Sequence, residues 1–156
     1  MPIIDLTLPR DALPRSALET LTRDLSQSLL HCDLARDSTG AMRRAEAMNW
    51  VYIHTLAPED IVIGGHNQAQ TGLPHYRIEV TIMAGAMSEA HRRDIAERMS
   101  AAVMRAEGGA MNLLNAARVW VLFHEVPDGQ WASGGHLYRL EDVRRYVTGN
   151  PHPAPE

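Results

Sequence analysis

The sequence predicts an α+β fold in which two tandem β-α-β units form one four-stranded sheet with two helices on one face. Short stretches of alternating apolar and polar residues are typical of strands. Leucines spaced by three and four residues indicate an amphipathic helix after the first strand. The second half of the chain then repeats the order of the first. A chain of 156 residues with 45% hydrophobic content is expected to form one domain.

The first unit is expected over residues 2–65. Leu6 and Leu8 alternate with Asp5 and Thr7 in its opening strand. The helix that follows starts near Pro14, ends near residues 31–32 and carries its apolar face at Leu18, Leu21, Leu25 and Leu29. We then expect a loop with about one helical turn over residues 33–48, a strong strand over residues 50–54, a turn at 57–60 and a short strand at 61–63.

A polar linker is expected over residues 66–74, a second unit over 75–147 and a flexible Pro-rich tail over 148–156. The second unit copies the first. Asp5–Leu8 is repeated 74 residues later as Glu79–Ile82, and the helix positions Leu21, Leu25 and Leu29 recur as Ile95, Met99 and Val103. Trp50, His54 and Gly64 recur at an offset of 70 as Trp120, His124 and Gly134. The offset falls from 74 to 70 between the helix and the second strand, so the loop between them is four residues shorter in the second copy.

Composition excludes several classes of function. The net charge of −4 and the scattered arginines do not suit a nucleic-acid partner. No apolar run approaches the length of a membrane span, so we expect a cytoplasmic protein without membrane contact. The single cysteine, Cys32, cannot form an intrachain disulfide. The eight histidines include no His-x-His pair, and no phosphate-binding glycine loop follows a strand, so neither a metal nor a cofactor is expected.

Alternation along the later strands divides their side chains between two faces of the sheet. Val51, Ile53, Val121 and Phe123 fall on one face, and Trp50, Tyr52, His54, Trp120, Leu122 and His124 fall on the other. Because the helices cover only one face, the tryptophan face is expected to meet a ligand or another subunit, and we expect an oligomer. The histidines could be hydrogen-bonded interface residues or paired functional groups, and the tryptophans could pack an interface or stack on substrate.

Pro2 is the candidate catalytic residue. Initiator methionine is normally removed before a small residue, which would leave Pro2 with a free secondary amine at the start of a strand. The pKa of an ordinary α-amino group is about 8, and an apolar pocket or a nearby cation would lower it toward neutrality. Such an amine is suited to general base catalysis.

These residues resemble the tautomerase superfamily. The resemblance rests on Pro2 with its strand, the duplicated helix and residues 119–135, which look like the second strand and hairpin of 4-oxalocrotonate tautomerase (4-OT). It implies catalysis by an N-terminal proline and a homotrimer of fused units, as in a group that also contains cis-3-chloroacrylic acid dehalogenase. Trp131 falls where 4-OT has the phenylalanine that lowers the pKa of the proline. Tyr76 falls opposite Pro2 in the repeat, so one catalytic site per chain is the most that is possible.

The superfamily's other functional residues are largely missing. The positions of its substrate-binding arginines hold Leu13, Met87, Trp50 and Trp120, and those of the dehalogenase machinery hold Ala84, Met87, Leu29 and Ser133. Arg10, Arg118 and His124 are left as candidate ligands for a substrate carboxylate, with Trp120 and Trp131 as candidate walls.

The resemblance implies an isomerase that transfers a proton between the keto and enol forms of a small 2-oxo or dicarbonyl acid. The alternatives are a trimeric binding or structural protein without catalysis, and a dehalogenase or decarboxylase of the same superfamily.

Overall fold

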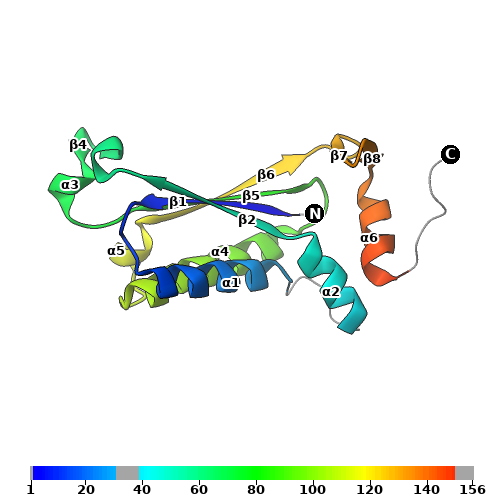
Figure 1. Ribbon diagram of the computed structural model, residues 1–156, viewed down its shortest axis with the longest axis horizontal. Helices are drawn as coiled ribbons and strands as arrows, with labels where there is room; N and C mark the ends of the chain where they lie inside the picture. The colour runs from blue at the N-terminus through cyan, green and yellow to red at the C-terminus, as the bar shows by residue number, and fades with distance from the viewer. Residues whose placement is uncertain (1, 31–38, 150–156) are drawn as a thin grey trace.

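The computed structural model describes residues 2–30 and 39–149. A four-stranded sheet of order β2-β1-β5-β6 extends along the molecule, and two long helices cover one of its faces (Figure 1). The strands are β1 (Ile3–Pro9), β2 (Trp50–Leu56), β5 (Tyr76–Met83) and β6 (Val119–Val126), and the helices are α1 (Arg15–Leu30) and α4 (Glu89–Glu107). The predicted α+β fold with two helices on one face is confirmed.

The register of the sheet relates the two halves by an approximate two-fold axis. β1 pairs in parallel with β2, and β5 pairs in parallel with β6, so that each half is a β-α-β unit. β1 and β5 join the halves in an antiparallel pair, with Asp5 opposite Glu79 at the centre. Ile3 lies opposite Thr81, and Thr7 lies opposite Arg77. The start of each unit therefore lies beside the end of the other unit's first strand.

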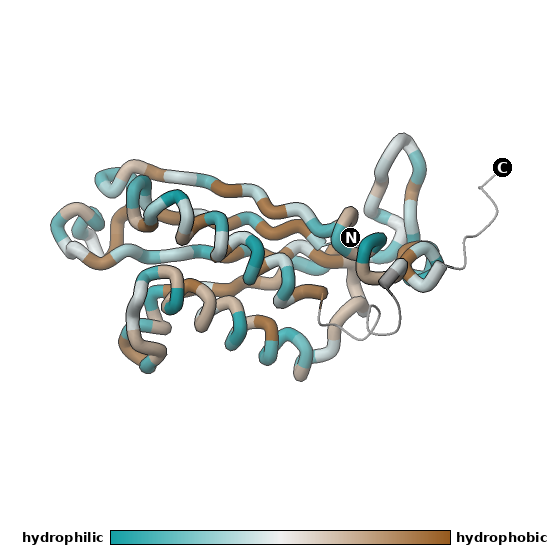
Figure 2. Tube along the Cα trace, turned by 60° about the horizontal axis from the view of Figure 1, so that its bottom comes forward, coloured by the Kyte–Doolittle hydropathy of each residue, from teal (hydrophilic) through white to brown (hydrophobic). Residues whose placement is uncertain are grey.

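The hydrophobic core lies between the sheet and the two helices. Alternate residues of β1 and β5 face the helices, and apolar residues alternate with polar ones along the strands (Figure 2). The buried positions of the two units are those that the repeat aligns, namely Ile4, Leu6, Leu8, Leu21, Leu25 and Leu29 in the first unit and Ile78, Val80, Ile82, Ile95, Met99 and Val103 in the second. The hydrophobic pattern of the sequence thus identifies both halves of one core.

Local signals set the ends of α4. The Ser88 side chain accepts a hydrogen bond from the backbone N–H of His91 at 3.2 Å, which satisfies a donor in the first helical turn. Gly108 ends the helix with a φ of 70°, a left-handed conformation that glycine adopts without strain. None of the helices in the described ranges is long and apolar enough to cross a membrane.

Small elements close the two ends of the sheet (Figure 1). One end carries the hairpin of β3 (Val62–Ile63) and β4 (His66–Asn67) with the short helices η2 (Pro58–Asp60), α3 (Gln68–Thr71) and α5 (Leu113–Ala116). The other carries the hairpin of β7 (Trp131–Ser133) and β8 (His136–Tyr138) with α6 (Leu140–Thr148). The stretch 66–74, expected to be a polar linker, contains β4 and α3 because the side chain of Asn67 caps a helical turn.

A further helix, α2 (Thr39–Ala47), occupies residues for which we predicted a loop with about one turn. It is held from outside its own sequence, because the Arg44 side chain donates through Nε and Nη2 to the carbonyl oxygen of Val147 at 3.0 and 2.9 Å. Its Ala, Met, Arg and Glu residues favour a helix, and this tertiary contact stabilises a segment that is too short to be a stable helix alone. Residues 31–38, which include Cys32 and the predicted end of the first helix, and residues 150–156 of the predicted tail lie outside the described residues.

We predict that Leu25→Ala and Met99→Ala destabilise the protein to a similar extent. The two residues occupy the same repeat position and are 0% exposed. Each truncation removes buried methylene groups and leaves a cavity, which costs about 2–5 kcal/mol. Urea unfolding measures the change, with Arg93→Ala on the exposed face of α4 as the control. A loss below about 1 kcal/mol at either position would contradict the shared core.

Candidate functional site

The two-fold relation gives the sheet two equivalent corners, one at each end. The Pro2 corner comprises Pro2, Thr81, His124 and Trp131. The Tyr76 corner comprises Tyr76, Thr7, Leu56 and the hairpin residues 61–63. The β7–β8 hairpin lies at the same end of the molecule as the chain's start, and the β3–β4 hairpin lies at the opposite end (Figure 1).

Pro2 is anchored to the sheet. It is half-buried and immediately precedes β1. Its carbonyl oxygen accepts a hydrogen bond from the backbone N–H of Trp50 at 3.3 Å. Continuing the β1–β5 register places Pro2 opposite Ile82, next to Met83 at the end of β5. A group at the nitrogen of Pro2 is thus held in a fixed position relative to both central strands.

An apolar cluster stabilises the Pro2 corner. Trp131 of β7, Tyr138 of β8 and Leu140 of α6 pack on the buried residues Met83, Val143 and Val147. The hairpin is therefore bound to the end of β5 beside which Pro2 lies. Of the residues predicted to bind substrate, the structure brings Trp131 and His124 to this end of the chain.

The recurring histidines each lie near the acidic residue of their own unit. His54 Nε2 lies 2.6 Å from Oδ1 of Asp5, and His124 Nε2 lies 3.8 Å from Oε1 of Glu79. All four side chains project from the face of the sheet that the helices leave open. His124 lies opposite Thr81, and Thr81 lies opposite Ile3, the residue after Pro2. Two strand spacings, each of about 5 Å, therefore separate His124 from Ile3. His54 belongs to the edge strand β2.

The other predicted binding residues lie at the far end of the sheet. Arg10 follows β1, and its backbone N–H donates to the carbonyl oxygen of Leu56 at 2.7 Å. Trp120 is 68% exposed and lies opposite Arg77. Since β1 spans seven residues, this end lies about 20 Å from Pro2. A single chain therefore does not bring Arg10, Trp120 or Arg118 to the Pro2 corner.

Arg118 is buried in a network of its own. Its Nη1 and Nη2 donate to the two carboxylate oxygens of Glu107 at 3.0 and 2.7 Å, and Nη1 also donates to the carbonyl oxygen of Pro74. Tyr76 donates its hydroxyl to Glu107 Oε1 at 3.0 Å. The hydrogen bond to Glu107 raises the pKa of the Arg118 guanidinium. This guanidinium is thus engaged within the chain, at the base of the Tyr76 corner.

Burial, with the charge of Glu107 as the next cause, raises the pKa of the Tyr76 phenol well above its ordinary value. The phenol is therefore a fixed hydrogen-bond donor at neutral pH. It does not provide a base at the position that corresponds to Pro2.

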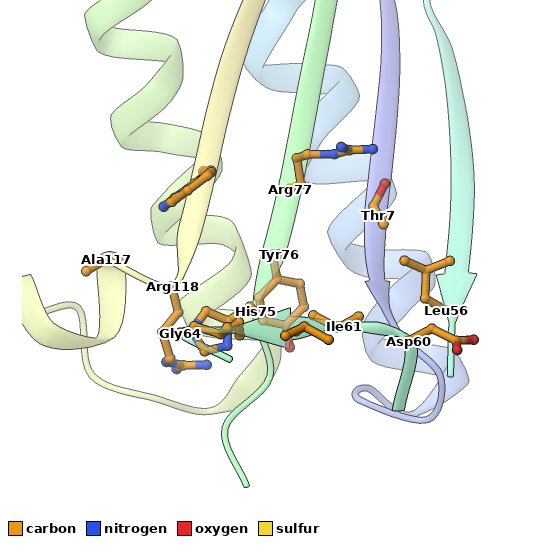
Figure 3. Close-up of a pocket in the computed structure, with 13 residues that line it drawn as sticks. Thr7, Leu56, Asp60, Ile61, Gly64, His75, Tyr76, Arg77, Ala117 and Arg118 are labelled. Carbon is orange, nitrogen blue, oxygen red and sulfur yellow. The ribbon is translucent and has the colours of Figure 1, made fainter. Parts of the chain in front are cut away.

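A cavity of about 600 Å³ lies at the Tyr76 corner (Figure 3). Thr7 and Arg77 stand at one side, and Leu56 with the β3–β4 hairpin forms another. Arg77 was not among the residues predicted to bind substrate, although its repeat partner Ile3 is apolar and this difference is visible in the sequence. Among the described residues, no group of three or more His, Cys, Asp or Glu side chains is placed to hold a metal ion.

Solved structures of similar fold cover most of the chain. Native fused 4-OT matches with a TM-score of 0.68 and 15% identity over 86% of this chain and 94% of that one. N1, a member of the cis-3-chloroacrylic acid dehalogenase family, matches with a TM-score of 0.63 and 16% identity, over 87% and 82% of the two chains. The chain has the tautomerase-superfamily fold.

The same fold extends to a macrophage migration inhibitory factor from Toxoplasma gondii, with a TM-score of 0.61 and 16% identity over 87% of this chain and 99% of that one. No family model and no curated protein matches the sequence. At these identities the tautomerase fold is what the relatives share with the chain.

We predict that Tyr76 makes the protein less stable at alkaline pH. Because the folded-state pKa is raised, the folded protein keeps the phenol proton that the unfolded chain releases above about pH 10. The stabilisation is complete below that pH and is lost as pH rises toward the folded pKa, with a slope of up to about 1.4 kcal/mol per pH unit.

Urea unfolding at increasing alkaline pH measures this effect against Tyr76→Phe, which lacks the titrating group. The chain contains no lysine, so fewer groups titrate in this window. The free energy of unfolding of the unmodified protein should fall more steeply than that of the variant. Parallel curves would show that the Tyr76 phenol has the same pKa in both states.

Proposed function

We propose that the chain is a tautomerase-like isomerase in which Pro2, exposed by removal of Met1, is the general base and acid. The observation that carries the proposal is the anchoring of Pro2 at the start of β1, beside the end of β5 and the Trp131 hairpin. A secondary amine at this point would be rigidly held next to an apolar cluster, and apolar surroundings lower the pKa of an amine. The fold shared with fused 4-OT supports the same assignment.

In the proposed reaction, the neutral Pro2 nitrogen accepts the proton of the enol hydroxyl of a small 2-oxo or dicarbonyl acid. The carbonyl forms as the double bond shifts, and the protonated amine then delivers a proton to the adjacent carbon. The reaction moves one proton and needs no redox partner. A general base of this kind contributes about 10²–10⁴-fold to the rate.

The remaining roles divide between the chain and its neighbours. His124 and Trp131 lie at the Pro2 end of the same chain and would bind the substrate carboxylate and exclude water, respectively. Arg10 lies at the opposite end of the sheet, so it would act on the Pro2 corner of a neighbouring subunit. Trp120 at that end would pack in the subunit interface and has no substrate role in this proposal. Arg118 is engaged by Glu107 and has no substrate role in this proposal.

A dehalogenase reaction has weaker support. The superfamily resemblance aligns the histidine that activates the dehalogenase with Leu29, and Leu29 is 4% exposed within the core. The chain therefore lacks, at that position, the histidine that a dehalogenase reaction would require. The fold shared with N1 does not by itself supply one.

The open face of the sheet supports the proposal of a homotrimer. It exposes Trp50, Tyr52, Trp120 and Leu122, with exposed fractions from 36% to 68%. These residues lie on the two edge strands, β2 and β6, and the polar residues of β1 and β5 lie between them. Groups of exposed apolar side chains are typical of an interface. Fused 4-OT has been solved as symmetric and asymmetric trimers.

We predict that Pro2→Ala lowers the rate of ketonisation of phenylenolpyruvate by about 10²-fold or more, because a primary amine replaces the secondary amine. The assay requires protein whose intact mass shows the loss of Met1. Pro14→Ala, at the exposed start of α1, is the matched proline control and should keep full activity. Equal rates in Pro2→Ala and the unmodified protein would refute the proposed base.

We predict that Leu122→Arg dissociates the trimer, because it places a charge among the exposed apolar residues of the edge strand β6. Sedimentation velocity would show a trimer for the unmodified protein and smaller species for the variant. Leu113→Arg, at an 89% exposed position of α5 on the helix side of the molecule, is the control and should remain trimeric. A monomeric unmodified protein would contradict the proposed assembly.

A further inference from the structure

The cavity at the Tyr76 corner has the size and lining of a small-molecule site. Its volume of about 600 Å³ lies in the usual range for ligand pockets. Most of its wall is apolar, formed by Leu56, the hairpin residues 61–63, Ala117 and Trp120. An apolar wall with a few polar groups at one side is the arrangement that binds small amphipathic molecules.

Two arginines line the cavity: Arg118 is paired with Glu107, and Arg77 is incompletely paired. Arg77 has one partner among the described residues, Glu79, and the distance from Nε to Oε1 is 3.6 Å, which exceeds a hydrogen bond. Its two terminal amino groups are left with open donors. Thr7 lies directly opposite on β1, and the Arg77 side chain extends toward it across the strands (Figure 3). A carboxylate here could accept hydrogen bonds from both side chains.

The acidic residue of the lining stands apart from this pair. Asp60 lies beside Leu56 at another rim, and its carboxylate points away from Arg77 (Figure 3). The negative charge of Asp60 therefore does not neutralise the guanidinium. The cavity has one positively charged side and one apolar side.

Hydrogen bonds hold the walls of the cavity in place. Gln68 is buried, its backbone N–H donates to the carbonyl oxygen of Ile61 at 2.9 Å, and its side-chain oxygen accepts from the backbone N–H of His75 at 3.1 Å. The hydrogen bond of Tyr76 to Glu107 fixes the floor. The pocket is therefore preformed, which reduces the entropic cost of binding.

Chemistry at this corner is limited by the residue that replaces the proline. Tyr76 lies inside the chain, so its nitrogen is an amide without basicity, and its hydroxyl is engaged by Glu107. The corner has an arginine where the Pro2 corner has Ile3. This corner therefore has a cavity and a cation but no base.

We infer that the Tyr76 corner is a second, non-catalytic binding site for a small monocarboxylate with an apolar body. The carboxylate is held by Arg77 and Thr7, and the body lies against Leu56 and the β3–β4 hairpin. This inference does not depend on the proposed isomerase activity, because no residue of the Pro2 corner takes part in it.

The test is titration of the full-length protein with 3-phenylpropionate, which has no enolisable 2-oxo group. The indole N–H resonances of the three tryptophans are followed by NMR and assigned by single Trp→Phe substitutions. Trp120 lines the cavity and should shift, with a calorimetric affinity that falls about tenfold or more in Arg77→Met. The neutral 3-phenylpropanamide should bind the unmodified protein at least about tenfold more weakly than the acid.

Arg98→Met is the matched control, since Arg98 is a similarly exposed arginine beside a carboxylate on α4, and it should bind the acid normally. The Pro2→Ala variant should also bind 3-phenylpropionate normally, as seen at Trp120. The binding test therefore gives a clear answer even if the proposed catalysis is refuted. A shift confined to Trp131, equal affinity in Arg77→Met, or equal binding of acid and amide would overturn the inference.

Discussion

The antiparallel pairing of β1 with β5 is the constraint on which the rest of the structure depends. It places Asp5 opposite Glu79 and brings the start of each β-α-β unit beside the end of the other unit's first strand. The same pairing sets α1 and α4 side by side over one continuous core, because both units turn the same face toward their helices. One register therefore creates the core, the two corners and the open face together.

Much of this arrangement could be predicted from the sequence, because it depends on periodicity. The alternation at residues 5–8, the leucine spacing of the first helix and the offset of 74 identify the central strands, both long helices and the buried positions. The smaller elements could not be predicted in this way. α2 is held by the contact of Arg44 with Val147, and α3 begins at a capping interaction of Asn67 that the polar composition of residues 66–74 concealed.

The candidate site was harder to predict, because periodicity does not show which side chains meet in space. Periodicity places Arg118 at the start of a strand but says nothing of Glu107, whose carboxylate engages both the guanidinium and the Tyr76 hydroxyl. Buried ionic groups need such partners, since an unpaired buried charge costs several kcal/mol. The sequence suggests Arg10 and Trp120 as substrate-binding residues only by the chemistry of their side chains. The strand register shows that they lie at the opposite end of the sheet from Pro2. Arg77 was not predicted as a binding residue, because a charged side chain on the exposed face of a strand is ordinarily solvated.

Because two units are fused in one chain, the two corners differ chemically whatever residues each contains. A chain has one α-amino group, so an amine base built on the first strand of a unit is available once, and the equivalent position of the second unit is a peptide nitrogen. Selection for the base does not act on that position. A side chain such as Tyr76 can then be buried there and use its hydroxyl to fix Glu107 and Arg118, which stabilises the end of the sheet. The walls of the cavity beside it are held by the hydrogen bonds of Gln68 to Ile61 and His75, so the cavity does not depend on a base at that position.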